Sequence, residues 1–253
     1  MKIAVCVKQV PDSETRINLA APAATLDQSG FTRVLNPYDA YAVEEAVKIK
    51  EAGGDVEVTA ITVGPEAVRE TIKKDCLAVG CDKAVIISDP ALAGADNAAI
   101  ATVLAAALQR DAYDLILCGI KAIDDDAGQV GILVADKLGI GHVSTVTKLE
   151  LGDGTLKADR EIEGGKEIVE ASLPCLLTCQ KGLNEPRLPS LPNIMKAGMK
   201  PMETLTCADL GIEPPANLVT VKMYSPPPPR GECKLVEAED PAAAARELAR
   251  LLN

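Results

Sequence analysis

A segment of small and acidic residues at 119–131 is the clearest candidate for phosphate binding. It reads GIKAIDDDAGQVG and joins a predicted strand to a predicted helix. The first N–H groups of a helix have no intrahelical partner, so they can bind a phosphate, and Ala127, Gly128 and Gly131 leave room for one to approach. The segment matches neither the P-loop nor the dinucleotide-binding fingerprint. A purely structural interpretation therefore stays open, in which the aspartates at 124–126 cap the helix and complement its dipole.

The residues Asn36-Pro37-Tyr38-Asp39 mark the start of another predicted helix and form a second candidate site. Asn is a favoured N-cap residue and Pro a favoured first helical residue, so capping explains the pattern without any ligand. At the same place, the side chains of Asn36 and Asp39 could hydrogen-bond the hydroxyls or ring nitrogens of a nucleotide. Both interpretations remain open at this point.

The chain contains few residues suited to acid–base or metal chemistry. His142 is the only histidine, and its glycine-rich surroundings predict a turn. Cys6 and Cys118 lie in apolar runs, where a thiol usually behaves as a small hydrophobic group. No C-x-x-C pair occurs, and three successive aspartates point in different directions, which disfavours a metal site. We therefore predict neither a catalytic residue nor a metal site.

The composition excludes several classes of function. The chain has 253 residues, with 26 Lys and Arg against 37 Asp and Glu, a net charge of −11, no Trp and one Phe. An acidic surface without aromatic stacking platforms is unsuited to nucleic acid. The start of the sequence does not resemble a signal peptide, and no apolar run approaches the roughly 20 residues of a membrane span. We expect a cytoplasmic protein with reduced cysteines and no membrane insertion.

The sequence predicts an α/β fold with a Rossmann-like parallel sheet and flanking helices. Short runs that are apolar throughout indicate central strands, and the segments between them carry helix start and stop signals. The predicted strands are 2–7, 56–63, 84–88 and 114–118, and the predicted helices are 37–52, 65–80, 97–110 and 128–137. Ligands of such folds bind at the carboxyl ends of the strands. The strand ends at 7–9, 63–65 and 119–122 are therefore expected to line one crevice.

The pattern changes after residue 143. Segments 147–151, 155–162 and 167–171, separated by glycines, predict an antiparallel hairpin extension. Residues 181–202 are rich in proline, so irregular structure is expected for most of them. Cations outnumber acids in this segment, which reverses the sign of the chain locally and indicates a docking surface for an acidic partner.

The C-terminal sequence predicts an arm. Prolines 226–229 form a stiff spacer before an amphipathic helix at 240–252. We therefore predict a nucleotide-binding α/β domain over 1–225 and a C-terminal arm over 226–253.

Two motifs carry a family resemblance. Asn184-Glu185-Pro186-Arg187, followed by Leu191-Pro192-Asn193-Ile194-Met195-Lys196-Ala197, resembles the signature of the β subunit of electron-transfer flavoproteins, and the similarity extends over most of the chain. It implies a heterodimer with an α subunit that holds most of a redox-active FAD. It also implies that this chain binds AMP in a structural role or, in a bifurcating branch, a second FAD. The implied nucleotide contacts are Cys6, Asn36, Pro37, Tyr38, Asp39, Val63, Gly119, Ile120, Lys121, Ala122, Ile123, Asp124, Asp125, Asp126, Ala127, Gly128, Gln129 and Val130.

The resemblance further implies an electron-carrier role in fatty acid β-oxidation. Segment 183–201 corresponds to a recognition loop whose leucine, here Leu191, inserts into a hydrophobic pocket of acyl-CoA dehydrogenases. Electrons then pass to a membrane quinone oxidoreductase or another acceptor, and the C-terminal arm reaches over the α subunit. The implied partner-docking residues are Arg187, Leu191, Pro192, Ile194, Met195, Lys196 and Lys200, the cations steering an acidic partner surface.

The identity of the bound nucleotide stays open in the sequence. The stretches 129–131 and 94–96 are closer to bifurcating members, whereas 124–126 and 184–187 are closer to dehydrogenase-linked members, and we favour AMP. Two other classes compete with the electron carrier. They are a stand-alone adenylyl-transferring enzyme that uses Lys8 or Lys121, and a nucleotide sensor that acts through oligomerisation.

Overall fold

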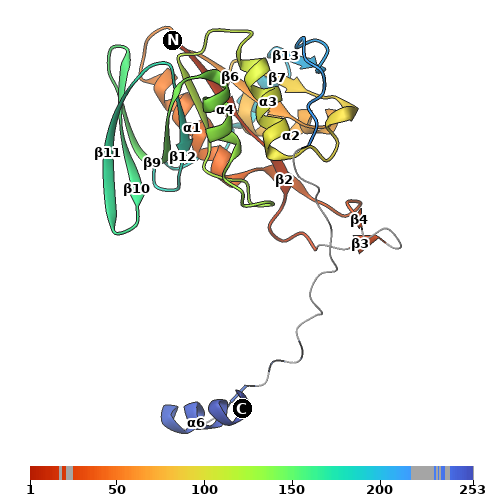
Figure 1. The fold of residues 1–253 in the computed structure, drawn as a ribbon, viewed down its shortest axis with the longest axis vertical. Coiled ribbons are helices and arrows are strands. Elements are labelled where there is room, and N and C mark those ends of the chain that lie inside the picture. The colour runs from red at the N-terminus through yellow and green to blue at the C-terminus, as the bar shows by residue number, and fades with distance from the viewer. Residues whose placement is uncertain are drawn as a thin grey trace. The chain divides into compact units, whose positions relative to one another are not determined.

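The computed structural model describes residues 1–16, 19–20, 25–217, 231, 233, 235–236 and 240–252 (Figure 1). The chain divides into two compact units, one comprising Met1–Arg16 and Ser29–Val221, the other Ile17–Gln28 and Lys222–Asn253. The second unit contains the paired strands β3 (Leu19–Ala20) and β4 (Thr25–Leu26) and the helix α6 (Pro241–Leu252). The predicted spacer at 226–229 lies outside the described residues.

A nine-stranded, mostly parallel sheet forms the centre of the first unit, which confirms the predicted fold class. Its strand order is β11-β10-β9-β12-β8-β1-β6-β7-β13. Only the pairs β9–β10 and β10–β11 are antiparallel, and they form the predicted hairpin extension. The strands are β1 (Lys2–Cys6), β6 (Glu57–Val63), β7 (Lys83–Ile87), β8 (Leu115–Gly119), β9 (Gly141–Leu151), β10 (Thr155–Ile162), β11 (Gly165–Ser172), β12 (Cys175–Cys179) and β13 (Met202–Leu205). A smaller pair joins β2 (Gln9–Pro11) and β5 (Arg33–Leu35).

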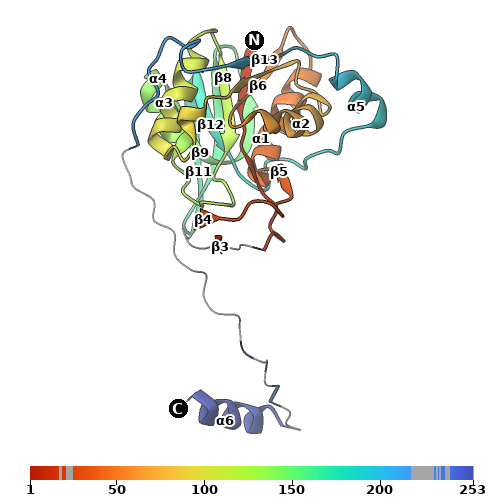
Figure 2. The ribbon, with the colours of Figure 1, turned by 90° about the vertical axis from the view of Figure 1, so that its right-hand side faces the viewer.

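Helices cover both faces of the sheet (Figure 2). On one face lie α1 (Pro37–Glu51), the short α2 (Arg69–Ile72) and the π-helical turn Lys73–Leu77 that continues α2; on the other lie α3 (Asn97–Leu108) and α4 (Val130–Leu138). Side chains of a strand point alternately to the two faces, so Ile3 and Val5 pack in one core and Ala4 and Cys6 in the other. This double covering explains why the central strands are apolar throughout.

Four sequence expectations differ from the structure. The helix predicted at 65–80 is divided into a 3-10 turn (Glu66–Val68), α2 and the π-helical turn. The proline-rich segment contains a helix, α5 (Leu191–Ala197), because Pro192 occupies its first turn, where a proline is tolerated. Strand β12 was not predicted at all. His142 lies not in a turn but in β9, paired in register with Leu176.

Candidate functional site

The two central strands β1 and β8 define the candidate site. They are adjacent and parallel, but the chain leaves β1 toward α1 on one face and leaves β8 toward α4 on the other. The crevice outside such a reversal point is the usual ligand site of doubly wound folds. A cleft of about 240 Å³ lies there, bounded by the exits of β1, β6 and β8 and by α3 and α4. The expected convergence of three strand ends is therefore present.

Asp39 ties the two strand exits together. One carboxylate oxygen accepts the N–H of Lys8, just after β1, at 2.7 Å, and the other accepts the N–H of Gly119, at the end of β8, at 2.9 Å. Asp39 is buried, and burial raises the pKa of its carboxyl to about 7 against the opposing effect of these amides and of Asn36. Its oxygens thus serve the backbone, which assigns Asp39 to the framework of the cleft.

Asn36 holds the loop that follows β8, at the same end of the sheet as Asp39. Its side-chain amide donates to the Lys121 carbonyl at 2.9 Å, and its side-chain oxygen accepts the N–H of Ile123 at 3.2 Å. Asn36 occupies the predicted N-cap position and Pro37 begins α1, but the Asn36 side chain makes no capping bond to the helix. The side chain instead holds the loop that follows β8. The start of α1 therefore positions the backbone after both β1 and β8, the two strands that border the cleft.

The start of α4 supplies the amide groups expected to bind phosphate. Its N-cap residue, Gln129, forms no side-chain capping bond, so the amides of the first turn are left without side-chain acceptors. Gly128 has a φ of 61°, and a Cβ on Gly131 would lie 2.5 Å from the Cys118 sulfur. A side chain at 131 would therefore collide with Cys118, and glycine keeps the backbone accessible at this point of the cleft.

The aspartates at 124–126 do not cap α4, so the capping interpretation of these residues was wrong. Asp124 and Asp125 instead pair with the ammonium of Lys8 at 2.8 and 3.2 Å, and Asp126 pairs with Lys121 at 2.7 Å. Both cations thus lie at the mouth of the cleft with carboxylate partners. These pairs are partly exposed, so each contributes little to stability, and the cations remain available to an anionic ligand.

Most residues implied by the resemblance line the cleft, and a few do not. Pro37, Tyr38, Ile123, Asp124 and Asp126 lie outside its lining. The remaining implied contacts line it: Cys6, Asn36, Asp39, Val63, Gly119, Ile120, Lys121, Ala122, Asp125, Ala127, Gly128, Gln129 and Val130.

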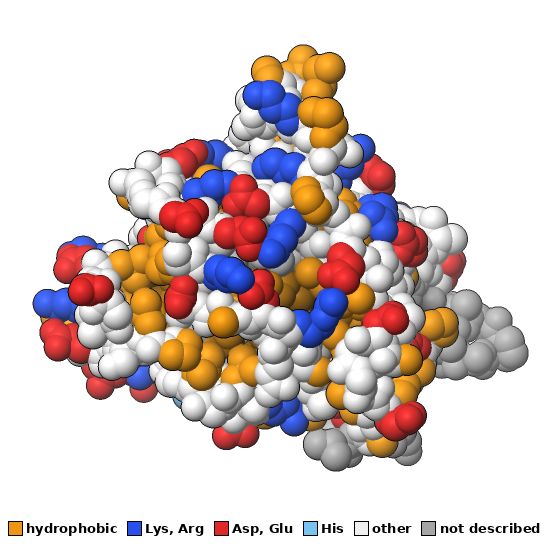
Figure 3. Space-filling model, turned by 90° about the horizontal axis from the view of Figure 1, so that it is seen from above, with side chains coloured by type: hydrophobic (Ala, Val, Ile, Leu, Met, Phe, Trp, Pro, Cys, Tyr) orange, Lys and Arg blue, Asp and Glu red, His pale blue; other side chains and the backbone are white. Residues whose placement is uncertain are grey.

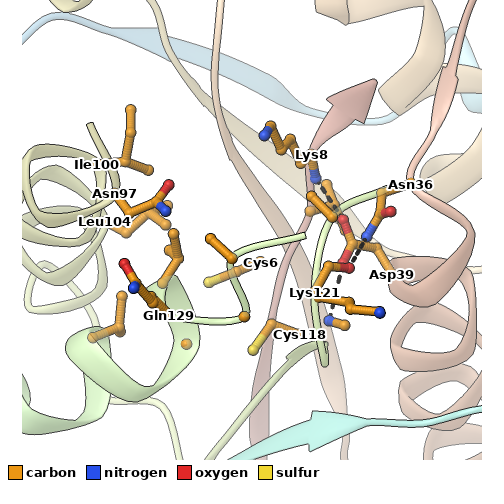
Figure 4. A pocket seen from close by; sticks show the side chains of 18 of the residues that line it. Cys6, Lys8, Asn36, Asp39, Asn97, Ile100, Leu104, Cys118, Lys121 and Gln129 are labelled. Atoms are coloured by element: carbon orange, nitrogen blue, oxygen red, sulfur yellow. Dashed lines mark hydrogen bonds between the residues drawn. The ribbon is translucent and has the colours of Figure 1, made fainter. Parts of the chain in front are cut away.

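One wall of the cleft was missed from the sequence. Asn97, Ile100 and Leu104 of α3 face the cleft opposite Lys8, Asn36 and Asp39, with Cys6 between the two groups (Figure 4). Because α3 follows the carboxyl end of β7, applying the strand-end rule to the strand predicted at 84–88 would have pointed to this wall.

The cysteines of the cleft are unsuited to nucleophilic chemistry. Burial raises the pKa of the Cys6 thiol to about 12 and that of Cys118 well above its ordinary value. A thiol is a nucleophile only as the thiolate, so both remain unreactive near neutral pH. Among the described residues no cluster of metal-ligating side chains occurs, and no helix of that part is long and apolar enough to cross a bilayer.

The proline-rich segment presents apolar side chains to solvent. Leu188 is 91% exposed, Leu191 75%, Met195 77% and Met199 80%, whereas Ala197 is buried. Helix α5 projects from the body of the molecule beside α2 (Figure 2). From above, hydrophobic side chains form the tip of this projection, with basic side chains behind them (Figure 3).

Two of the cations assigned to docking are engaged within the chain. Arg187 binds the carboxylates of Glu44 and Glu51. The Lys200 ammonium donates to the carbonyls of Leu77 at 2.8 Å and Cys81 at 2.6 Å, and burial lowers its pKa. Lys196 remains an exposed cation of the segment.

Comparison with known proteins identifies the family. The model of the electron transfer flavoprotein domain matches residues 24–210. The chain is 40% identical over 257 residues to the electron transfer flavoprotein subunit beta of Bacillus subtilis, covering 100% of this chain and 98% of the relative. The chain belongs to the family of electron transfer flavoprotein β subunits. It is also 35% identical over 254 residues to the subunit beta of Sus scrofa, with 99% of each chain covered.

A further relative of this electron transfer flavoprotein β subunit belongs to a larger assembly. Subunit CarD of the caffeyl-CoA reductase–Etf complex of Acetobacterium woodii is 39% identical over 217 residues, covering 85% of this chain and 82% of the relative. Electron transfer flavoprotein β subunits are electron carriers rather than catalysts. Family membership therefore removes the support for a stand-alone nucleotide-transferring enzyme.

Proposed function

We propose that this chain pairs with an α subunit holding a redox-active FAD and carries electrons as part of that heterodimer. It accepts them from an acyl-CoA-type dehydrogenase and passes them to a membrane quinone oxidoreductase or another acceptor, in the cytoplasm and in the service of fatty acid β-oxidation. The chain itself binds AMP, which has a structural role. The observation that carries the proposal is the cleft where three strand exits and the start of α4 converge in a chain of this family.

The residues of the cleft fit an adenosine phosphate. The amides at the start of α4 and the small residues Gly128 and Gly131 suit the phosphate. Lys8 and Lys121 can donate to it by exchanging their aspartate partners. The apolar side chains of Val63, Ile100 and Leu104 suit the adenine face. AMP has no redox chemistry of its own, so its contribution there is to hold the strand exits and the α3 wall together.

A second FAD at the same place is the alternative. It is supported by the 39% identity to CarD, a subunit of a reductase–Etf complex, which is no lower than the 35% identity to the subunit beta of Sus scrofa. This alternative makes the heterodimer a bifurcating flavoprotein, in which the α subunit still holds the other FAD.

Extraction of the assembled complex distinguishes the two. The chain is co-expressed with its α subunit, purified as a complex and extracted with acid, and the released nucleotides are separated and counted. One FAD and one AMP per heterodimer is the expected result. Two FAD support the alternative, and no adenine nucleotide beyond the α-held FAD contradicts both. The isolated chain should show no flavin absorbance.

We predict that Leu191→Ala slows electron transfer from the dehydrogenase without loss of flavin. Leu191 is the first residue of α5 and is 75% exposed, so its side chain is not part of the chain's own core. Removing an apolar anchor from an interface of this kind costs about 1–2 kcal/mol of binding, roughly a tenfold rise in the apparent KM. Stopped-flow reduction of the complex at several dehydrogenase concentrations measures it, and Leu151→Ala, at an exposed leucine of β9, is the matched control. Unchanged kinetics with Leu191→Ala contradict the docking role.

A further inference from the structure

We call residues 188–199 the docking segment. Arg187, the residue before it, is attached to α1 through its guanidinium group. Arg187 donates from Nε and Nη2 to Glu44, each at 2.8 Å, and from Nη1 and Nη2 to Glu51 at 2.6 and 2.8 Å. The backbone N–H of Arg187 also donates to Glu44 at 3.2 Å. Five hydrogen bonds thus join one residue to two carboxylates of the same helix.

The burial of Glu44 makes this attachment stronger than a surface ion pair. The side chain of Glu44 is only 6% exposed, whereas that of Glu51 is 57% exposed. An exposed pair contributes little, but a buried carboxylate that loses its cation is left unpaired at a cost of several kcal/mol. Bidentate arginine geometry also fixes orientation, which a lysine cannot do.

A second contact of the same helix lies three residues earlier. The side-chain amide of Asn184 donates to the carbonyl of Tyr41 at 3.0 Å and to Glu45 at 2.8 Å. At the far end of the segment, Ala197 is buried and Lys200 binds two carbonyl groups. Residues 188–196, most of which are exposed, are therefore held between two anchors.

Helix α1 links this anchor to the cleft. Its beginning carries Asn36 and Asp39, which hold the strand exits, and its middle and end carry Glu44 and Glu51, which hold Arg187. One helix therefore sets the position of the docking segment relative to the nucleotide cleft.

We propose that Arg187 is a positioning residue, which clamps the docking segment onto α1 through Glu44 and Glu51 so that its apolar side chains meet the partner in one orientation. This inference rests on the proposed docking function of the same segment. It assigns Arg187 an intramolecular task in place of the steering charge that the family resemblance implies.

Two substitutions of opposite charge separate the two roles. Arg187→Gln makes the docking face more negative, and Glu51→Gln makes it more positive, yet each opens the clamp. Glu51→Gln leaves the buried Glu44 paired, so it keeps the test valid if Arg187→Gln fails to fold. Glu70→Gln, an exposed carboxylate of α2, makes the same charge change without touching the clamp.

The test uses the full two-chain complex with an acyl-CoA dehydrogenase as donor. We expect Arg187→Gln and Glu51→Gln both to slow bimolecular electron transfer 3- to 10-fold, with flavin content unchanged. Deuterium uptake by peptides covering 188–199 should become faster in both, and Glu70→Gln should change neither. Opposite effects of the two variants on the rate, with unchanged uptake, assign Arg187 to steering and overturn the proposal. Faster uptake in both variants, while Leu191→Ala leaves the transfer rate unchanged, overturns the docking function and with it this positioning role.

Discussion

A Gly119→Val variant is expected to lose the nucleotide proposed to bind in the cleft and to unfold with a free energy about 3 kcal/mol lower than that of the wild type. A Cβ at 119 would lie 2.8 Å from the backbone nitrogen of Asp39 and 2.8 Å from the carbonyl carbon of Tyr38. Both are backbone atoms of α1, which cannot rotate away. Either β8 or α1 must therefore shift, and the bond between the Gly119 N–H and Asp39 is broken in the process.

Urea unfolding of the complex and nucleotide content after acid extraction measure the two effects. Gly165→Val is the matched control, because a Cβ at 165 meets nothing within 4 Å and the residue is exposed at the start of β11. The control should retain wild-type nucleotide content and stability. Retention of full nucleotide content by Gly119→Val would show that the contact between β8 and α1 does not shape the cleft.

An Asp39→Asn variant is expected to change how stability depends on pH. Burial raises the pKa of Asp39 from 3.8 in the reference state to about 7 in the folded chain. The folded chain therefore binds this proton more tightly than the unfolded chain between these values. Because the unfolded chain binds fewer protons there, the stability of the wild type falls as the pH rises from about 4 to 7 and is level above that range.

The pH dependence is measured by comparing the two proteins. Asn has no proton to lose, so the wild-type free energy of unfolding should fall relative to the variant by up to about 1.4 kcal/mol per pH unit within this window. Denaturant unfolding of wild type and variant at pH 4.5, 5.5, 6.5 and 7.5, in the same buffer series, gives the difference. Parallel curves would falsify the assignment of a raised pKa to Asp39. Asp159→Asn, on the hairpin extension, is a control with the same chemical change.

The central strands of the fold were predictable because they are short, apolar on both faces and alternate with segments that carry helix start and stop signals. The strand predicted at 56–63 and the helix predicted at 97–110 agree with β6 and α3 to within two residues. Strand β12 (Cys175–Cys179) was missed although it is as long as β1 and β8, because it follows an antiparallel segment and no predicted helix precedes it to mark a strand–helix alternation. Its assignment depends on pairing with β8 and β9, which are remote in the chain.

For the candidate site too, the location could be predicted from the sequence but the roles of its side chains could not. The glycine-bordered amides at 119–131 and the strand-end rule are sufficient to locate the cleft from the sequence. The roles of individual side chains do not follow in this way, because Asn36 and Asp39 suit both capping and ligand contact. In the structure neither side chain caps α1. Both line the cleft and hydrogen-bond backbone groups that follow β1 or lie at and after the end of β8.

By itself the sequence determined the fold class, the family and the edge of the sheet where a ligand is expected to bind. These depend on hydrophobic pattern, local helix signals and long motifs, which are properties of neighbouring residues. Only the tertiary structure decided which polar side chains face a ligand and which bind the protein, as for Arg187, Lys200 and Asp39. A hydrogen bond forms with whichever partner the fold brings within about 3 Å, and that partner lies from 31 to 143 residues away in the chain.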